Sequence, residues 1–152
     1  DFSKDLFPRL LEMGWPMYAQ AIDGVWFDVG SPQELIRAQN TLIERRNELP
    51  FPLQEGARIE NGSFIDPDAS VHERSRVQQS VVGRHASVAE GAVLNQCVLM
   101  SGSVVEKGVQ LTSCILSPNA VVKSNVSASG VVLGDGERLE NTTNTENEGI
   151  DF

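Results

Sequence analysis

The amino-acid sequence predicts a mainly β protein, in which a region of helices and one hairpin precedes a parallel β-helix of short repeats. The first observation is that aliphatic residues between residues 57 and 136 recur at spacings of six, six and five. The second is that a small residue lies two positions before each of them. The third is that residues 1–56 suit two helices and one hairpin, which bury too little surface to form a domain by themselves.

A short helix and a hairpin are the first expected elements. The stretch SKDLFPRLLEMG has a proline in its first helical turn and a glycine just past its end. Two strand-like runs follow, MYAQAI and VWFDV, and the dipeptide Asp23-Gly24 between them favours a tight turn. The sequence therefore predicts a hairpin over residues 17–29.

The longest expected helix begins after Ser31 and runs to about residue 47. Ser31 suits the N-cap, Pro32 the first helical position and Glu34 the position where a carboxylate completes a capping box. An apolar stripe follows at helical spacing, formed by Leu35, Ile36, Ala38, Leu42 and Ile43. Residues 48–56 hold two prolines and a final glycine. We therefore assign residues 1–47 to one unit and residues 48–56 to a linker.

A repeat of seventeen residues covers residues 57–136 and predicts three short strands per coil. Two aliphatic columns show the period, namely Ile65, Val82, Leu99, Leu116 and Leu133, and Val71, Val88, Val105 and Val122. Because residues two apart on a strand share a face, each side of the coil points one aliphatic and one small residue inward. Three sides per turn form a triangular prism with one continuous core. The period alone does not show the hand of the coil.

The two cysteines fit the same column of small inward residues. Cys97 and Cys114 lie seventeen residues apart. We therefore expect two buried free thiols on neighbouring coils, where cysteine acts as a small hydrophobic residue. The absence of a C-x-x-C spacing argues against a zinc site or a disulfide framework, and a redox pair is the alternative to this interpretation.

Charge and hydropathy narrow the classes of function. A net charge of −9 disfavours nucleic acid and anionic membranes as partners, because both require a basic face. The sequence has no long apolar run and no signal-peptide pattern, so we expect a soluble cytoplasmic protein. Residues 137–152 are polar and acidic, which predicts a disordered tail. The first expected element begins at the very start of the chain, which suggests a fragment of a longer protein.

The repeat resembles that of the hexapeptide-repeat family over about residues 57–136. This resemblance implies a left-handed parallel β-helix, and the hand comes from the family because it is opposite to the usual right-handed crossover. Parallel coils leave flat outer faces and open ends. We therefore expect a homo-oligomer formed through the β-helix.

The first half resembles the C-terminal end of the nucleotidyltransferase domain in sugar-1-phosphate nucleotidyltransferases, or NDP-sugar pyrophosphorylases. These enzymes share a motif Trp-x-Asp-x-Gly-(Ser/Thr)-Pro, which is present here as Trp26, Asp28, Gly30, Ser31 and Pro32. The resemblance implies an enzyme that joins a sugar 1-phosphate to a nucleoside triphosphate and releases pyrophosphate. The helix near the start and the long repeat favour a mannose-1-phosphate guanylyltransferase, which makes GDP-mannose.

The same resemblance implies roles for two residues of the motif. Asp28 corresponds to the second of two aspartates that hold Mg²⁺ over the reacting phosphates, and Trp26 packs near the substrate. A hard divalent cation binds carboxylate oxygens and keeps such a carboxylate ionised. From the residues alone, the alternative is that Asp28 caps a turn or pairs with an arginine. The family's glycine-rich GxGTRLxP loop and its first metal aspartate do not occur in the sequence, so we expect the 152-residue chain by itself to be inactive.

Two other classes of function compete with this one. A hexapeptide acyltransferase uses a histidine as general base, and the two histidines, His72 and His85, both occupy outward positions of ordinary coils. In the other class the β-helix is purely a structural module for oligomerisation. Four arginines crowd the first coils and offer either a site for an anionic effector or a solvated face: Arg58, Arg74, Arg76 and Arg84.

Overall fold

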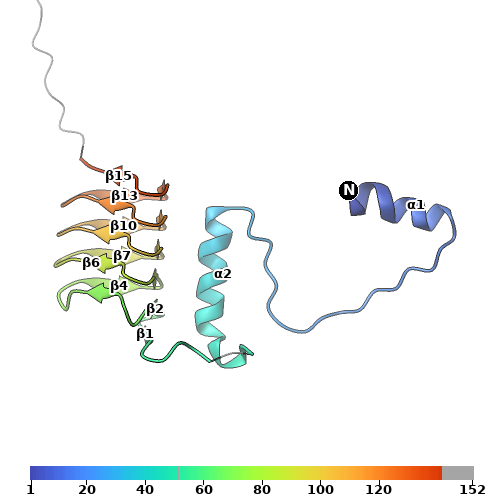
Figure 1. Ribbon diagram of the computed structural model, residues 1–152, viewed down its shortest axis with the longest axis horizontal. Coiled ribbons are helices and arrows are strands. Elements are labelled where there is room, and N and C mark those ends of the chain that lie inside the picture. The colour runs from blue at the N-terminus through green and yellow to red at the C-terminus, as the bar shows by residue number, and fades with distance from the viewer. Residues whose placement is uncertain (51, 142–152) are drawn as a thin grey trace, which may run out of the picture.

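The computed structural model describes residues 1–50 and 52–141, and it divides into helices followed by a stack of short strands (Figure 1). A single π-helical turn, η1 (Phe2–Leu6), runs into α1 (Phe7–Glu12). After an extended segment come α2 (Pro32–Glu44) and a 3-10 turn, η2 (Arg46–Glu48). The expected first helix and the expected helix after Ser31 are therefore both present. The second helix ends three residues earlier than the predicted end at about residue 47.

In the part of the chain that the structure describes, fifteen strands form three sheets around one axis, which is the predicted triangular prism. Sheet A contains, in spatial order, β1 (Arg58–Glu60), β2 (Ser63–Ile65), β5 (Val81–Val82), β8 (Val98–Leu99), β11 (Ile115–Leu116) and β14 (Val132–Leu133). Sheet B contains β15 (Arg138–Leu139), β12 (Val121–Val122), β9 (Val104–Val105), β6 (Ser87–Val88) and β3 (Ser70–Val71). Sheet C contains β13 (Ser127–Ser129), β10 (Gln110–Thr112), β7 (Val93–Asn95) and β4 (Arg76–Gln78).

The strand register confirms the repeat of seventeen residues. Along sheet A, Val82 pairs with Leu99 and Leu116 with Leu133, all in parallel strands. Leu99 is completely buried, and the inward aliphatic and small residues of all three sheets form one continuous core. Each coil therefore gains its stability by stacking on the coil before and after it. The predicted fold class, a parallel β-helix preceded by helices, is confirmed.

The first side of the β-helix differs from the prediction. Ile59 was expected to begin the parallel coils, but β1 pairs antiparallel with β2. The turn between them is Asn61-Gly62, with φ values of 49° and 68°, and this dipeptide is typical of a two-residue hairpin turn. Within residues 1–50 and 52–141 no coil precedes β2, so β1 folds back and covers the open edge of β2.

The β-helix also ends later than expected. The sequence placed its end at Gly136, but β15 pairs in parallel with β12 and Leu139 packs against the core. The amide N–H of Val121 donates to the carbonyl of Glu137 over 2.8 Å, so the last coil is tied down by its backbone. The disordered tail predicted for residues 137–152 is therefore wrong for residues 138–139, which form β15, and residues 142–152 of that prediction lie outside the described residues.

The expected hairpin over residues 17–29 is not formed. This segment contains no strand, and its side chains include Tyr18, which is 93% exposed, and Ile22, which is 79% exposed. A hairpin of two strands is marginal in water unless a third strand or a helix covers its apolar face. The described part of the chain places no such element against it.

Helix α2 packs on the outer face of sheet A, beside the stack of coils (Figure 1). Ile36 of α2 contacts the outward side chains of Val98 and Ile115, which are only 3% and 4% exposed. The outward residues of the parallel strands of this sheet are all apolar: Phe64, Val81, Val98, Ile115 and Val132. This outer column provides the surface on which α2 buries its apolar stripe.

Candidate functional site

The motif lies in the extended segment that leads into α2. Val25 and Phe27 are partly buried, whereas Trp26 and Asp28 are exposed. This alternation is that of an extended chain, in which residues two apart share a side. Trp26 and Asp28 therefore lie on one exposed side of the segment, and Phe27 lies on the side that faces α2.

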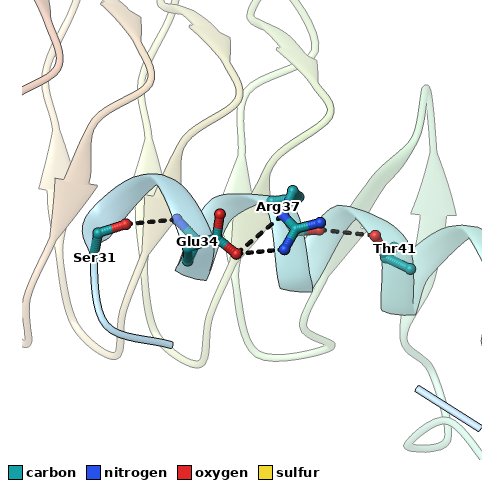
Figure 2. A network of polar contacts seen from close by, with 4 residues as sticks. All are labelled: Ser31, Glu34, Arg37 and Thr41. Carbon is teal, nitrogen blue, oxygen red and sulfur yellow. Dashed lines mark hydrogen bonds and ion pairs between the residues drawn. The ribbon is translucent and has the colours of Figure 1, made fainter. Parts of the chain in front are cut away.

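A capped helix N-terminus follows the motif directly (Figure 2). The hydroxyl of Ser31 accepts a hydrogen bond from the amide N–H of Glu34 over 3.2 Å, and Pro32 occupies the first helical turn. The carboxylate of Glu34 accepts two hydrogen bonds from Arg37, at 3.0 Å from Nε and 2.5 Å from Nη2. The N-cap is thus formed as predicted, while the glutamate of the capping box pairs with Arg37.

The carboxylate of Asp28 makes no hydrogen bond or ion pair within the described ranges 1–50 and 52–141. Its backbone carbonyl accepts a bond from the amide N–H of Gly30 over 3.0 Å, so the main chain turns tightly just before Ser31. No group of three or more His, Cys, Asp or Glu side chains that could hold a metal occurs in this part of the chain. Mg²⁺ is commonly bound by one or two carboxylates together with substrate phosphates, so Asp28 fits a single ligand of such a site.

Trp26 is 75% exposed, and its ring faces away from α2 on the same side of the segment as Asp28. An aromatic ring in this position offers a flat apolar surface to a substrate or to another part of a protein.

Phe27 contacts Arg37, a pairing that the sequence did not predict. The guanidinium carbon of Arg37 lies 5.2 Å from the centroid of the Phe27 ring, within the range of a cation–π contact. Ten residues separate the two side chains, and neither helical nor strand periodicity connects them. The apolar residues at the outward positions of sheet A could have indicated that α2 packs there. No local sequence pattern indicates the contact with Phe27.

An open groove of about 350 Å³ runs between α2 and one corner of the β-helix. The residues that line it are Gln33, Ile36, Arg37, Asn40, Thr41, Glu44, Gln79, Gln96 and Ser113. At the corner, Ser113 donates a long hydrogen bond of 3.4 Å to the side-chain carbonyl of Gln96, one coil below. The groove therefore adjoins the Glu34–Arg37 pair but contains no cluster of charge.

Comparison with known families assigns the repeat region. The GMPPB C-terminal domain family matches residues 55–150, which is more than half of the chain. The chain belongs to this family. The match begins in the linker and includes all fifteen strands of the β-helix.

Curated relatives of this GMPPB C-terminal domain include bacterial enzymes. It is 31% identical over 81 residues to a glucose-1-phosphate adenylyltransferase of Clostridium kluyveri, which covers 53% of this chain and 21% of the relative. It is 32% identical over 82 residues to the enzyme of the same name from Clostridium botulinum strain Eklund 17B, again covering 21% of the relative. The alignments thus span about a fifth of these relatives.

Two solved structures are similar to parts of this chain. The acetyltransferase domain of PglB from Neisseria gonorrhoeae has a TM-score of 0.37 at 20% identity and covers 72% of this chain and 64% of that one. A hexapeptide transferase family protein from Anaplasma phagocytophilum has a TM-score of 0.24 at 18% identity, with 51% and 70% of the two chains covered.

The residues considered for acyl transfer or effector binding lie in ordinary positions of the coils. Both histidines are exposed, and Nδ1 of His72 accepts a hydrogen bond from the amide N–H of Arg74 over 3.1 Å. Three of the four arginines form exposed ion pairs: Arg58 with Glu60, Arg74 with Glu90, and Arg84 with Asp68. These pairs give the first coils of this GMPPB C-terminal domain a solvated, charge-balanced face.

Cys97 and Cys114 are both buried free thiols, as the column of small residues predicts. Each thiol donates to the carbonyl two residues before it, Asn95 and Thr112 respectively, at 3.3 Å. The neighbouring Cys114 thiol and burial both raise the pKa of the Cys97 thiol. A thiol held in its neutral form in an apolar core is a packing group rather than a reactive one.

Among residues 1–50 and 52–141, no helix is both long and apolar enough to cross a bilayer.

Proposed function

We propose that this chain is the C-terminal part of a cytoplasmic sugar-1-phosphate nucleotidyltransferase, and that the whole enzyme makes GDP-mannose from GTP and mannose 1-phosphate with release of pyrophosphate. One observation carries the proposal: the Trp-x-Asp-x-Gly-Ser-Pro motif runs directly into a helix that is packed on a β-helix of this family. The names of the curated relatives make ATP and glucose 1-phosphate the competing substrate pair.

In this proposal Asp28 supplies one carboxylate ligand to Mg²⁺. Bound there together with substrate phosphates, the cation would neutralise negative charge that develops on the phosphates during the reaction. An exposed carboxylate without a partner in the described residues is available for this role. Trp26, on the same side of the segment, would present its ring to the bound substrate.

The β-helix packs against α2, the helix that follows the motif, and its other outer faces offer surfaces for self-association. Its sheet A is covered by α2, whereas the outer faces of sheets B and C carry no other described element. Flat faces of this kind suit a symmetric homo-oligomer. Light scattering coupled to size-exclusion chromatography measures this directly, and a monomer at all accessible concentrations would remove this part of the proposal.

Pyrophosphate release by the protein expressed from its complete reading frame tests the activity. Mannose 1-phosphate with GTP is expected to give the largest kcat/KM, compared with glucose 1-phosphate and ATP and with the two crossed pairs. Faster turnover of glucose 1-phosphate with ATP would replace the substrate assignment but keep the reaction class. No release with any pair, together with acetyl transfer to an amine or hydroxyl acceptor, would replace the reaction class.

Asp28→Asn is the sharpest test of the metal ligand. The change keeps the shape of the side chain and removes its charge, so magnesium-dependent turnover is expected to fall by about two or more orders of magnitude. The melting temperature should stay level, because the carboxylate contacts no described residue. Glu55→Gln, which removes an exposed carboxylate in the linker, is the matched control. Normal turnover with a sharply lowered melting temperature would identify Asp28 as a structural residue.

A further inference from the structure

Arg37 lies where the motif segment meets α2. Its guanidinium carbon is 5.2 Å from the centroid of the Phe27 ring, and Phe27 is partly buried in a segment whose other side chains are mostly exposed. A cation over an aromatic face is attracted by the negative charge of that face. Phe27, the residue directly before Asp28, is therefore held by its contact with Arg37.

Arg37 is itself held on a rigid support (Figure 2). The carboxylate of Glu34 accepts from both Nε and Nη2 of Arg37, which restricts the rotation of the guanidinium group. The preceding residue, Ile36, is buried against Val98 and Ile115 of sheet A. A continuous series of contacts therefore leads from the β-helix through α2 and Arg37 to Phe27.

The rest of the motif segment has little else to hold it. Across the described chain, no hydrogen bond joins residues 16–29 to α2 or to the β-helix. A glycine lies on each side of residues 25–29: Gly24 has a φ of 123°, and a side chain added at Gly24 or Gly30 would meet no atom within 4 Å. Because glycine backbone is permissive, the direction of Asp28 depends on how Phe27 is held.

We infer that Arg37 is a positioning residue, which fixes Phe27 on α2 and thereby aims the carboxylate of Asp28 at its magnesium ion. This inference rests on the proposed function, because it assigns a purpose to the geometry of that same site. It also gives the β-helix a part in the reaction, since the β-helix holds the helix from which the motif is positioned.

The first test measures the magnesium requirement of the protein expressed from its complete reading frame. Arg37→Gln is expected to raise the Mg²⁺ concentration for half-maximal turnover by about two- to fivefold, the size of one exposed cation–π contact, with kcat at saturating Mg²⁺ nearly unchanged. Arg37→Lys keeps a cation over the ring and should restore most of the loss. Arg45→Gln is the matched control, because Arg45 pairs with Glu48 at the same helical spacing and contacts no aromatic ring of the described residues.

The second test needs no activity. In the 152-residue chain, ¹⁵N relaxation is expected to give backbone order parameters at Phe27 and Asp28 that fall below about 0.6 in Arg37→Gln, while those of α2 stay near about 0.85. Phe27→Leu should have the same effect, and the double variant should add nothing further. Arg45→Gln should leave both sites unchanged.

The outcomes separate this inference from the function on which it rests. If Asp28→Asn is inactive while Arg37→Gln matches the unaltered protein in magnesium requirement and in order parameters, Arg37 does not position Asp28. An altered order parameter with an unaltered magnesium requirement would also overturn the inference. If the unaltered protein turns over no sugar 1-phosphate, the proposed function fails, and positioning of a magnesium ligand fails with it even where the relaxation data show the Phe27–Arg37 contact.

Discussion

Helix α2 and the segment of residues 15–29 are neighbours in the chain, but they differ in the burial of their apolar side chains. In α2, Ile36 and Ile43 are each only 8% exposed. In the preceding segment, Trp15, Tyr18 and Trp26 all stand mostly in solvent. The exposed segment is the richer of the two in apolar residues, so composition does not explain the difference.

The difference in burial is explained by a packing surface, which α2 has and the preceding segment lacks. The apolar outward column of sheet A lies against α2 and removes its stripe from water. Burial of an apolar side chain contributes about 1.5–3 kcal/mol, but only when a second surface covers it. Apart from Arg37 of α2, which contacts Phe27, no described element covers residues 15–29, where the predicted hairpin does not form. An element that the local sequence predicts therefore forms only where another part of the fold covers its apolar face.

The largest expected effect comes from disrupting the β-helix, which is the surface on which α2 packs. Leu99→Asp places an unpaired carboxylate at a completely buried position and should unfold the β-helix, at a cost of more than about 4 kcal/mol. Helix α2 should melt with it, because its packing surface is lost. Circular dichroism during thermal melting measures this. Ile22→Asp, in the uncovered segment, should leave melting unchanged, and equal melting of both variants would contradict the register.

A smaller effect is expected from loosening the contact between α2 and sheet A. Ile36→Ala removes the side chain that packs on Val98 and Ile115, and should cost about 2 kcal/mol in the free energy of unfolding. Urea denaturation measures the change. Ile22→Ala serves as the control and should stay within about 0.5 kcal/mol of the unaltered chain. A loss at Ile22 as large as that at Ile36 would show that the segment is covered after all.

The N-cap of α2 is expected to contribute less again. Ser31→Ala removes the acceptor for the amide N–H of Glu34 and should cost about 1 kcal/mol. Thr41→Ala is the control, because its hydroxyl only donates to the carbonyl of Arg37 within the helix and should change stability by less than about 0.5 kcal/mol. Both changes are read by denaturation monitored at helical wavelengths, and equal losses would argue against the cap.

The smallest effect is expected at the charged corner of the β-helix, far from α2. Hydrogen bonds from Lys107 and Arg74 lower the pKa of Glu90 below its ordinary value of 4.5. A lowered folded pKa means that Glu90 stabilises the fold above about pH 4.5 and that this contribution is lost as the pH falls through the folded pKa. Glu90→Gln should therefore lower the melting temperature slightly at about pH 7 and have a smaller effect at about pH 3. The same difference at both pH values would exclude an ionic origin.

Prediction from the sequence succeeded for elements whose signal is local. Ser31, Pro32 and Glu34 marked the start of α2 correctly because a cap involves only neighbouring residues. The columns through Leu99 and Cys97 were placed correctly because every coil repeats the same inward pattern. Of the candidate site, the motif residues and the N-cap were recognisable, whereas the contact between Phe27 and Arg37 was not, since it depends on how an extended segment folds back on a helix.

The sequence by itself determined the β-helix, its period and its buried thiols, because stacking of identical coils is a one-dimensional problem in which each repeat contacts only its neighbours. Only the tertiary structure decided that β1 turns back on β2, that β15 extends the stack, and that α2 covers sheet A rather than sheet B or C. These choices depend on which free edges and apolar outer faces remain once the stack is formed. A side chain such as Ile36 is buried only when a surface distant in the sequence packs against it. That contact exists only in the folded chain.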